Sequence, residues 1–67
     1  MKANEIFAIA EFLGSEITDE QSDKLMGLAR EHLSIADMEQ LKEVAHGSLY
    51  TDLSMYEGEM GGFARYY

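Results

Sequence analysis

Carboxylates are the most abundant side chains in this sequence that could take part in chemistry. Asp and Glu account for 13 of the 67 residues, and the only histidines are His32 and His46. Paired carboxylates can act as a general acid and base, and they can also bind divalent cations. The densest cluster, Asp19, Glu20 and Asp23, falls where a helix is expected to begin, however. Because the helix dipole favours anions at that end, this cluster alone does not predict a site.

The sequence lacks the spacings that catalytic and metal-binding motifs require. Glu31–His32 has no second histidine at helical spacing, so the zinc-protease signature is absent, and the acids do not follow the calcium-loop pattern. His32 is predicted to project toward the apolar side of its helix. His46 is predicted to lie in a last helical turn, where a cationic ring suits the dipole. We therefore predict a protein that is not an enzyme and that has neither a cofactor nor a metal site.

Four helical segments are expected to position these side chains, at residues 3–13, 19–32, 35–46 and 49–58. In each of them apolar residues recur at three- and four-residue spacing, which indicates one buried helix face. The first three faces are Ile6, Ile9, Ala10 and Leu13; Leu25, Leu28, Ala29 and Leu33, with Met26 at the margin; and Ile35, Met38, Leu41, Val44 and Ala45. The fourth is Leu49, Leu53, Tyr56 and Met60. A strand is the alternative for this last segment, because Leu49, Thr51, Leu53 and Met55 also alternate.

Capping residues and glycines mark the expected ends of these helices. Thr18–Gln21 and Ser34–Asp37 are spaced as capping boxes at the starts of the second and third helices. Gly14 and Gly47 are predicted to end the first and third helices, because glycine accepts positive φ at a helix C-terminus. Ser48 is predicted to cap the fourth helix, which is expected to end near Gly58 or Gly61.

These elements predict an all-α fold, a compact bundle of three to four short helices in a single domain over residues 1–67. Residues 61–67 are expected to form a short aromatic tail behind Gly61–Gly62. A domain of this size hides only about 60% of the surface that its unfolded chain exposes. Since the sequence has no cysteine, disulfides cannot compensate. A second copy or a partner protein would supply the missing buried surface, so a homodimer is one expectation.

The charge balance narrows the expected partners. The formal net charge is -8, so the chain should repel phosphate backbones and anionic lipid. On this basis we expect no direct nucleic-acid binding. We also expect no membrane partner, because the longest apolar stretch, Ile6–Ala10, is far too short to span a bilayer. A protein with a basic surface is the natural partner. A cytoplasmic location is expected from the absence of cysteine and of a signal-peptide pattern. The alternative is that the acidity only maintains solubility.

Two surfaces are predicted to bind a protein partner. The first consists of acidic residues on the second and third helices: Glu20, Asp23, Glu31, Glu39 and Glu43. Such a row could imitate the phosphates of a nucleic acid, although a merely solvated face is the alternative. The second consists of aromatic and basic residues near the C-terminus: Tyr56, Phe63, Arg65, Tyr66 and Tyr67. Tyrosine and arginine are enriched in interface hot spots, but Tyr56 and Phe63 could instead close the core.

The small, acidic, cysteine-free and helical profile resembles that of phage-encoded proteins that block a host nucleic-acid enzyme. The predicted function is a protein-binding module that acts as an inhibitor or adaptor of a nucleic-acid-processing protein. One alternative is a structural module that self-associates through the Leu49–Met60 stripe. A helix-turn-helix regulator is a further alternative, which Asp37, Glu39 and Glu43 disfavour, because recognition helices need basic groups.

Overall fold

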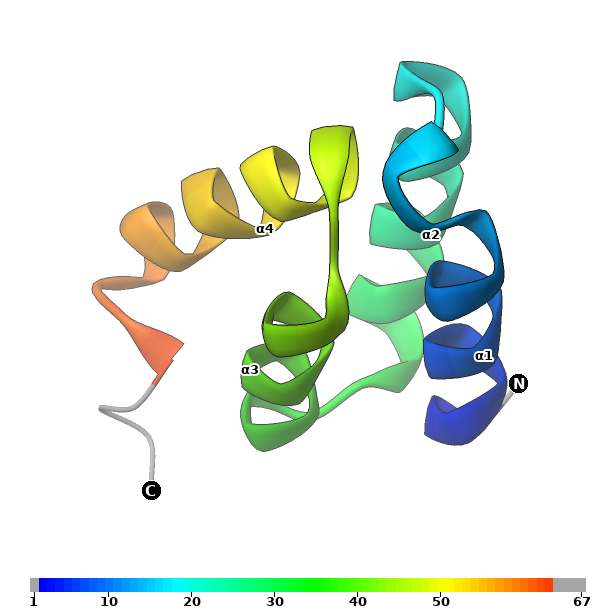
Figure 1. The fold of residues 1–67 in the computed structure, drawn as a ribbon. Coiled ribbons are helices and arrows are strands. Elements are labelled where there is room, and N and C mark those ends of the chain that lie inside the picture. The colour runs from blue at the N-terminus through cyan, green and yellow to red at the C-terminus, as the bar shows by residue number, and fades with distance from the viewer. Residues whose placement is uncertain (1, 64–67) are drawn as a thin grey trace.

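The computed structural model describes residues 2–63, and these residues form helices without any strand (Figure 1). The elements are α1 (Ala3–Leu13), the 3-10 turn η1 (Gly14–Glu16), α2 (Asp19–His32), α3 (Ile35–Val44) and α4 (Gly47–Met60). The predicted all-α bundle is confirmed, and the fourth segment is a helix rather than a strand. Arg65, Tyr66 and Tyr67, which were predicted to contact a partner, lie outside the described residues.

Both predicted capping boxes are present. The Thr18 hydroxyl accepts a hydrogen bond from the Gln21 backbone N–H at 3.1 Å, and the Gln21 side chain accepts one from the Thr18 N–H at 2.9 Å. Ser34 and Asp37 make the same reciprocal pair at 3.2 and 3.4 Å. Each box satisfies two backbone donors that the helix itself cannot pair. The starts of α2 and α3 therefore follow directly from local sequence.

The junction between α3 and α4 differs from the prediction. The third helix ends at Val44 rather than at residue 46, and Gly47 is the first residue of α4, with φ of 58°. Ala45 and His46 are extended, and they connect α3 to α4. His46, not Ser48, occupies the N-cap position, and it makes no side-chain capping bond. Gly47 was misassigned because positive φ suits glycine on either side of such a junction.

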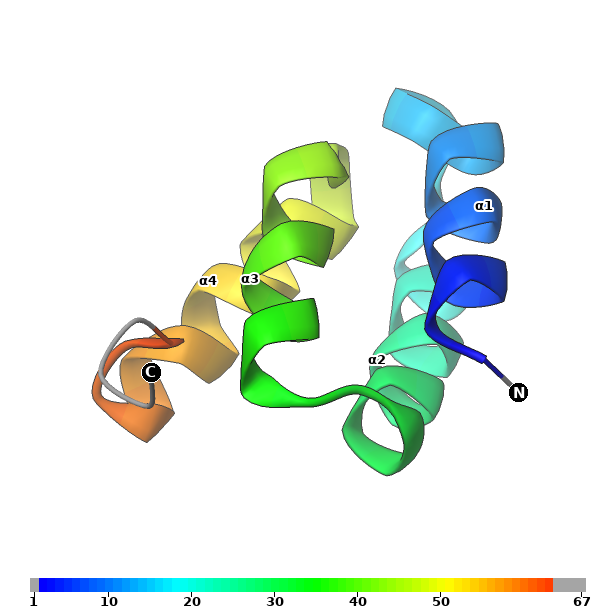
Figure 2. The ribbon, with the colours of Figure 1, turned by 90° about the horizontal axis from the view of Figure 1, so that it is seen from below.

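The helices pack in an arrangement that separates α2 from α3. Each of these two helices packs mainly on α1 and α4 (Figures 1 and 2). The connection between α2 and α3 is short, with only Leu33 and Ser34 lying outside helices. The consecutive helices α2 and α3 are therefore connected in space mainly through α1 and α4.

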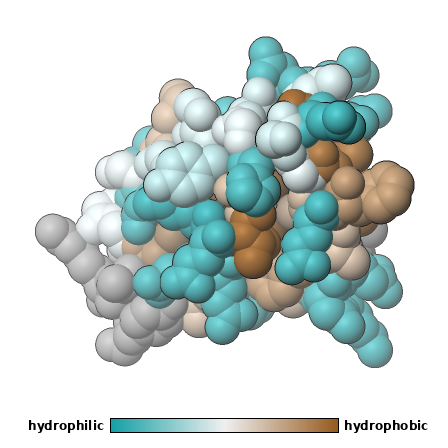
Figure 3. Space-filling model, viewed as in Figure 1, coloured by the Kyte–Doolittle hydropathy of each residue, from teal (hydrophilic) through white to brown (hydrophobic). Residues whose placement is uncertain are grey.

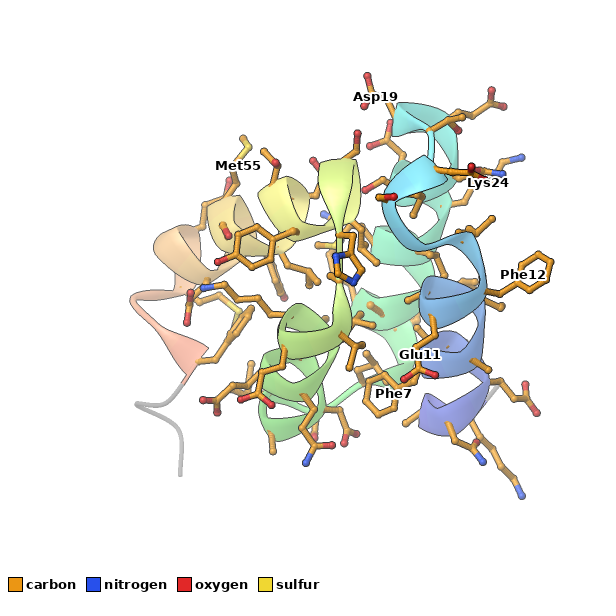
Figure 4. All side chains as sticks on the ribbon, in the orientation of Figure 1. Phe7, Glu11, Phe12, Asp19, Lys24 and Met55 are labelled. Carbon is orange, nitrogen blue, oxygen red and sulfur yellow. The ribbon has the colours of Figure 1, made fainter. Side chains whose placement is uncertain are left out.

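The buried core draws on every predicted apolar face. Its members are Ile6, Ala10, Ile17, Leu25, Met26, Ala29, Met38, Leu41, Ala45, Leu49, Leu53 and Phe63. Met26, which was predicted at the margin of the apolar face of its helix, is only 4% exposed. Phe12, by contrast, is 89% exposed and points away from the bundle (Figure 4). Its position in α1 lies opposite the face that Ile6 and Ala10 bury.

The C-terminal end of α4 folds back into the core. The helix continues past Gly58 to Met60, and Gly61, the later of the two expected ends, terminates it in the left-handed conformation with φ of 80°. The Gly62 N–H then donates to the Glu57 carbonyl at 2.9 Å, and Gly62 also has positive φ. This turn brings Phe63 into the core, where it has no exposed surface. Phe63 therefore belongs to the core and not to an exposed tail.

Candidate protein-binding surfaces

Helix α4 has a buried stripe with one flank on each side of it. Leu49 and Leu53 are buried against the other helices, and Tyr56 and Met60 are partly buried beside them. One flank carries Asp52, Met55, Tyr56 and Glu59, at three- and four-residue spacing, and lies along α2. The other flank carries Tyr50 and Glu57 and lies along α3. The two flanks create two different acidic surfaces.

The first surface is a groove between α2 and α4, which we name the α2/α4 groove. Its lining residues are Asp23, Met26, Arg30, Asp52, Met55, Tyr56 and Glu59. Met55 is 64% exposed and projects away from the bundle (Figure 4). The groove thus combines carboxylates with an exposed apolar side chain.

Two polar side chains in the α2/α4 groove are held by the fold itself. Ser22 is completely buried, and its hydroxyl donates a hydrogen bond to Oδ2 of Asp52. The Arg30 Nε donates to the Met26 carbonyl at 3.3 Å, and the guanidinium lies 5.8 Å from the centre of the Tyr56 ring. In contrast, no hydrogen bond or ion pair within residues 2–63 involves the side-chain carboxylate of Asp23 or Glu59.

The second surface, which we name the α3/α4 patch, contains its own cation. Its lining residues are Glu39, Lys42, Glu43, Tyr50 and Glu57. The Lys42 ammonium forms an ion pair with Glu57 and also lies 5.6 Å from the centre of the Tyr50 ring. Hydrogen bonding to Glu57 raises the pKa of Lys42. The same bond, helped by the Phe63 backbone N–H, lowers the pKa of Glu57.

The structure does not gather the predicted acidic residues into one row. Asp23 lines the α2/α4 groove, whereas Glu39 and Glu43 line the α3/α4 patch. Glu20 lies 3.8 Å from Lys24, and Glu31 lies 3.7 Å from His32. The separation follows from the packing, because α2 and α3 lie mainly against α1 and α4 rather than against each other. Figure 3 shows one face of the molecule, on which hydrophilic side chains surround smaller apolar areas.

The predicted aromatic surface is also divided. Tyr56 is partly buried and forms part of the α2/α4 groove, with its ring centre 6.0 Å from that of Phe63. Phe63 is buried, so it cannot touch a partner from its position in the core. Of this predicted set, Tyr56 alone among the described residues remains at a surface.

Sequence reasoning missed several groove residues. Asp52, Met55 and Glu59 were not predicted as binding residues, although their spacing with Tyr56 indicates one helix flank. Ser22 carries a clearer signal, because it shares the apolar face of α2 with Leu25. A polar residue on a buried face needs a hydrogen-bond partner, which indicates a polar contact on the neighbouring helix.

The histidines lie at the surface. His32 lies beside Glu31 with its side chain 34% exposed, and His46 precedes α4 instead of ending α3. His46 lines a hollow with Glu11 at the end of α1. Within residues 2–63, no three His, Asp or Glu side chains are grouped so that they could hold a metal ion. No helix in this range combines the length and the apolarity needed to cross a bilayer.

Comparison with known proteins adds no relative. No protein-family model, no curated protein and no solved structure matches this chain. A functional proposal therefore depends on the charge, exposure and geometry of the two acidic surfaces.

Proposed function

We propose that this chain is a protein-binding module that contacts a basic surface on another protein, and that it acts as an inhibitor or adaptor of a nucleic-acid-processing protein. The observation that carries the proposal is the placement of the acids. All 13 acidic residues lie within residues 2–63 and none of them is buried, so their negative charge is presented at the surface. A surface of this kind attracts basic proteins and accelerates their association.

A basic surface that binds nucleic acid is a suitable target for physical reasons. Lys and Arg side chains that neutralise phosphates can also pair with carboxylates, and both kinds of complex weaken as salt rises. The chain would then compete with nucleic acid for the same surface. It would not bind nucleic acid itself, because its own charge repels phosphate.

Affinity capture from the native host tests this proposal. We expect the captured protein to elute as salt is raised, and to elute also when a duplex or single-stranded nucleic acid is added as competitor. Capture that is unaffected by both salt and nucleic acid would contradict the proposal. So would tight binding of duplex DNA by the isolated chain in a low-salt mobility-shift assay.

Self-association is a second candidate function, and the exposure of Phe12 favours it. The stripe first considered for this role is used within the chain, because Leu49 and Leu53 are buried. Phe12 instead presents a large apolar group on the outside of α1. Sedimentation of the wild type and of Phe12→Ala over the micromolar range tests this candidate. A strict monomer for the wild type would rule it out.

The geometry gives no support to a helix-turn-helix function. Such a motif places its second helix in the major groove and needs cations on that helix. Helix α3 presents Glu39 and Glu43, and its Lys42 is paired with Glu57.

A further inference from the structure

We infer that the α2/α4 groove is the contact surface of this module, and that it binds a basic segment of the partner in which an apolar residue is flanked by arginine or lysine. The inference rests on the proposed function and specifies the place and the chemistry of the contact. It combines the charge of the groove, the exposed methionine in its lining and the fixed polar groups beside it.

The charge of the groove requires a cationic partner. Asp23, Asp52 and Glu59 line it, and among the described residues Arg30 is the one basic residue in the lining. Within residues 2–63 the carboxylates of Asp23 and Glu59 make no side-chain pair, so an incoming cation need not break an existing one. The α3/α4 patch differs, since its own Lys42 already pairs with Glu57.

The apolar component of the partner follows from Met55. This side chain is 64% exposed within the lining of a groove that also contains Met26 and Tyr56. Methionine is flexible and polarisable, so it adapts to partners of irregular shape. Covering it removes apolar surface from water, which an apolar side chain does without also bringing a charged group to the contact. A segment with one apolar residue between cations fits both properties.

The groove is also partly preorganised. Buried Ser22 holds the Asp52 carboxylate, and Arg30 is held between the Met26 carbonyl and the Tyr56 ring. Groups that are already fixed lose less conformational entropy when a ligand binds. The α3/α4 patch provides an example within the chain of the expected contact, because Lys42 there lies against both a carboxylate and an aromatic ring.

A synthetic peptide with a central leucine flanked by arginines is the probe, and binding is followed by fluorescence anisotropy. The test variant is Asp23→Lys/Glu59→Lys, and the matched control is Glu39→Lys/Glu43→Lys. Each double reversal moves the formal charge from -8 to -4, so the two variants have the same net charge. We expect the groove variant to lose about tenfold or more in affinity, and the control to lose about threefold or less. Circular dichroism melts establish that both variants fold.

A second arm tests the apolar contact. Replacing the central leucine of the peptide by serine should weaken binding to the wild type. The same change in the peptide should have little effect on its binding to the Met55→Ser protein, because that protein lacks the side chain that the leucine is predicted to contact. Equal effects in the two proteins would overturn the predicted contact. Asp23→Asn/Glu59→Gln, which adds no positive charge, should reproduce part of the loss caused by the reversal.

The outcomes distinguish this inference from the proposed function. Equal losses for the two double reversals, or no loss for either, would overturn the α2/α4 groove as the contact surface. The proposed function would still stand if the captured host protein eluted with salt and nucleic acid. Concentration-dependent dimerisation that Met55→Ser abolishes would also overturn the inference, because a second copy would then be the occupant.

Discussion

The two flanks of α4 contain similar residues but differ in how the fold uses them. On the α3 side, Lys42 pairs with Glu57 and covers the Tyr50 ring, and the backbone of Phe63 also bonds to Glu57. On the α2 side, Met55 is exposed in a groove lined by acids. One surface thus pairs a carboxylate with its own lysine, while in the other the carboxylates of Asp23 and Glu59 make no pair within residues 2–63. Net charge alone does not distinguish them.

The largest expected effect concerns Phe63, whose backbone supports Glu57 on the α3 side and whose ring lies beside Tyr56 on the α2 side. Phe63→Ala should lower the free energy of unfolding by about 3 kcal/mol or more, because it removes a fully buried aromatic ring and leaves a cavity. Urea unfolding followed by circular dichroism measures the loss. A cost below about 1 kcal/mol would show that Phe63 does not complete the core.

Ser22→Ala tests the polar link between α2 and α4. Loss of a buried hydroxyl that donates to a carboxylate should cost about 1–2 kcal/mol of unfolding free energy. Ser48→Ala is the matched control, because its hydroxyl donates to Asp19 at an exposed site. We expect this control to unfold close to the wild type. Equal effects of the two substitutions would mean that burial of Ser22 adds nothing to its bond with Asp52.

The Lys42–Glu57 pair predicts a pH dependence of stability that originates on the α3 side. The lowered pKa of Glu57 means that its stabilisation is present above its unfolded pKa and is lost as pH falls through the folded value. The raised pKa of Lys42 means that its stabilisation is present below its unfolded pKa and is lost as pH rises through the folded value. The pair therefore stabilises the protein at neutral pH.

Glu57→Gln should consequently lower the urea midpoint at about pH 7, and its effect should shrink as pH falls through the lowered pKa of Glu57. Glu59→Gln on the opposite flank is the control, since within residues 2–63 its side chain makes no pair. The urea midpoint of Glu59→Gln should change between neutral and acidic pH by the same amount as that of the wild type. The same loss for both variants at neutral pH would remove the distinction between the flanks.

The smallest expected effect concerns Met55. Met55→Ala should change the free energy of unfolding by no more than about 0.5 kcal/mol, because the side chain is mostly exposed. The same variant should weaken binding of the leucine-containing peptide. A large loss of stability would indicate that Met55 supports the fold, and the α2/α4 groove would then be structural.

Local sequence predicted the helices well where side chains bond to the nearby backbone. The capping boxes at Thr18 and Ser34 set the starts of α2 and α3 without help from distant residues. The α3–α4 junction could not be predicted in the same way. Positive φ at Gly47 is compatible with a helix end or a helix start, and the packing of α4 decides between them.

The candidate surfaces were harder to predict than the helices. Periodicity shows which face of a helix is buried, but it does not show which helix covers that face. Asp23 and Glu43 were therefore predicted on one surface, although they line different ones. Asp52 and Met55 become candidate binding residues only because α2 lies beside them and forms the other side of the groove. Ser22 differs, because its own position on the apolar face of α2 indicates a polar contact with a neighbouring helix, and this contact is the bond to Asp52 in α4.

The packing of α2 and α3 on α1 and α4 also has a consequence for how the chain folds. The contacts of α1 with α3, and of α2 with α4, join segments that are distant in the sequence, so a local helical hairpin cannot complete the core. Non-local contacts require loop closure before they stabilise anything, which slows folding relative to simple up-and-down bundles. No slow prolyl isomerisation is expected, because the sequence contains no proline. Cleavage between Leu33 and Ser34 would leave two fragments, each lacking half of its packing partners.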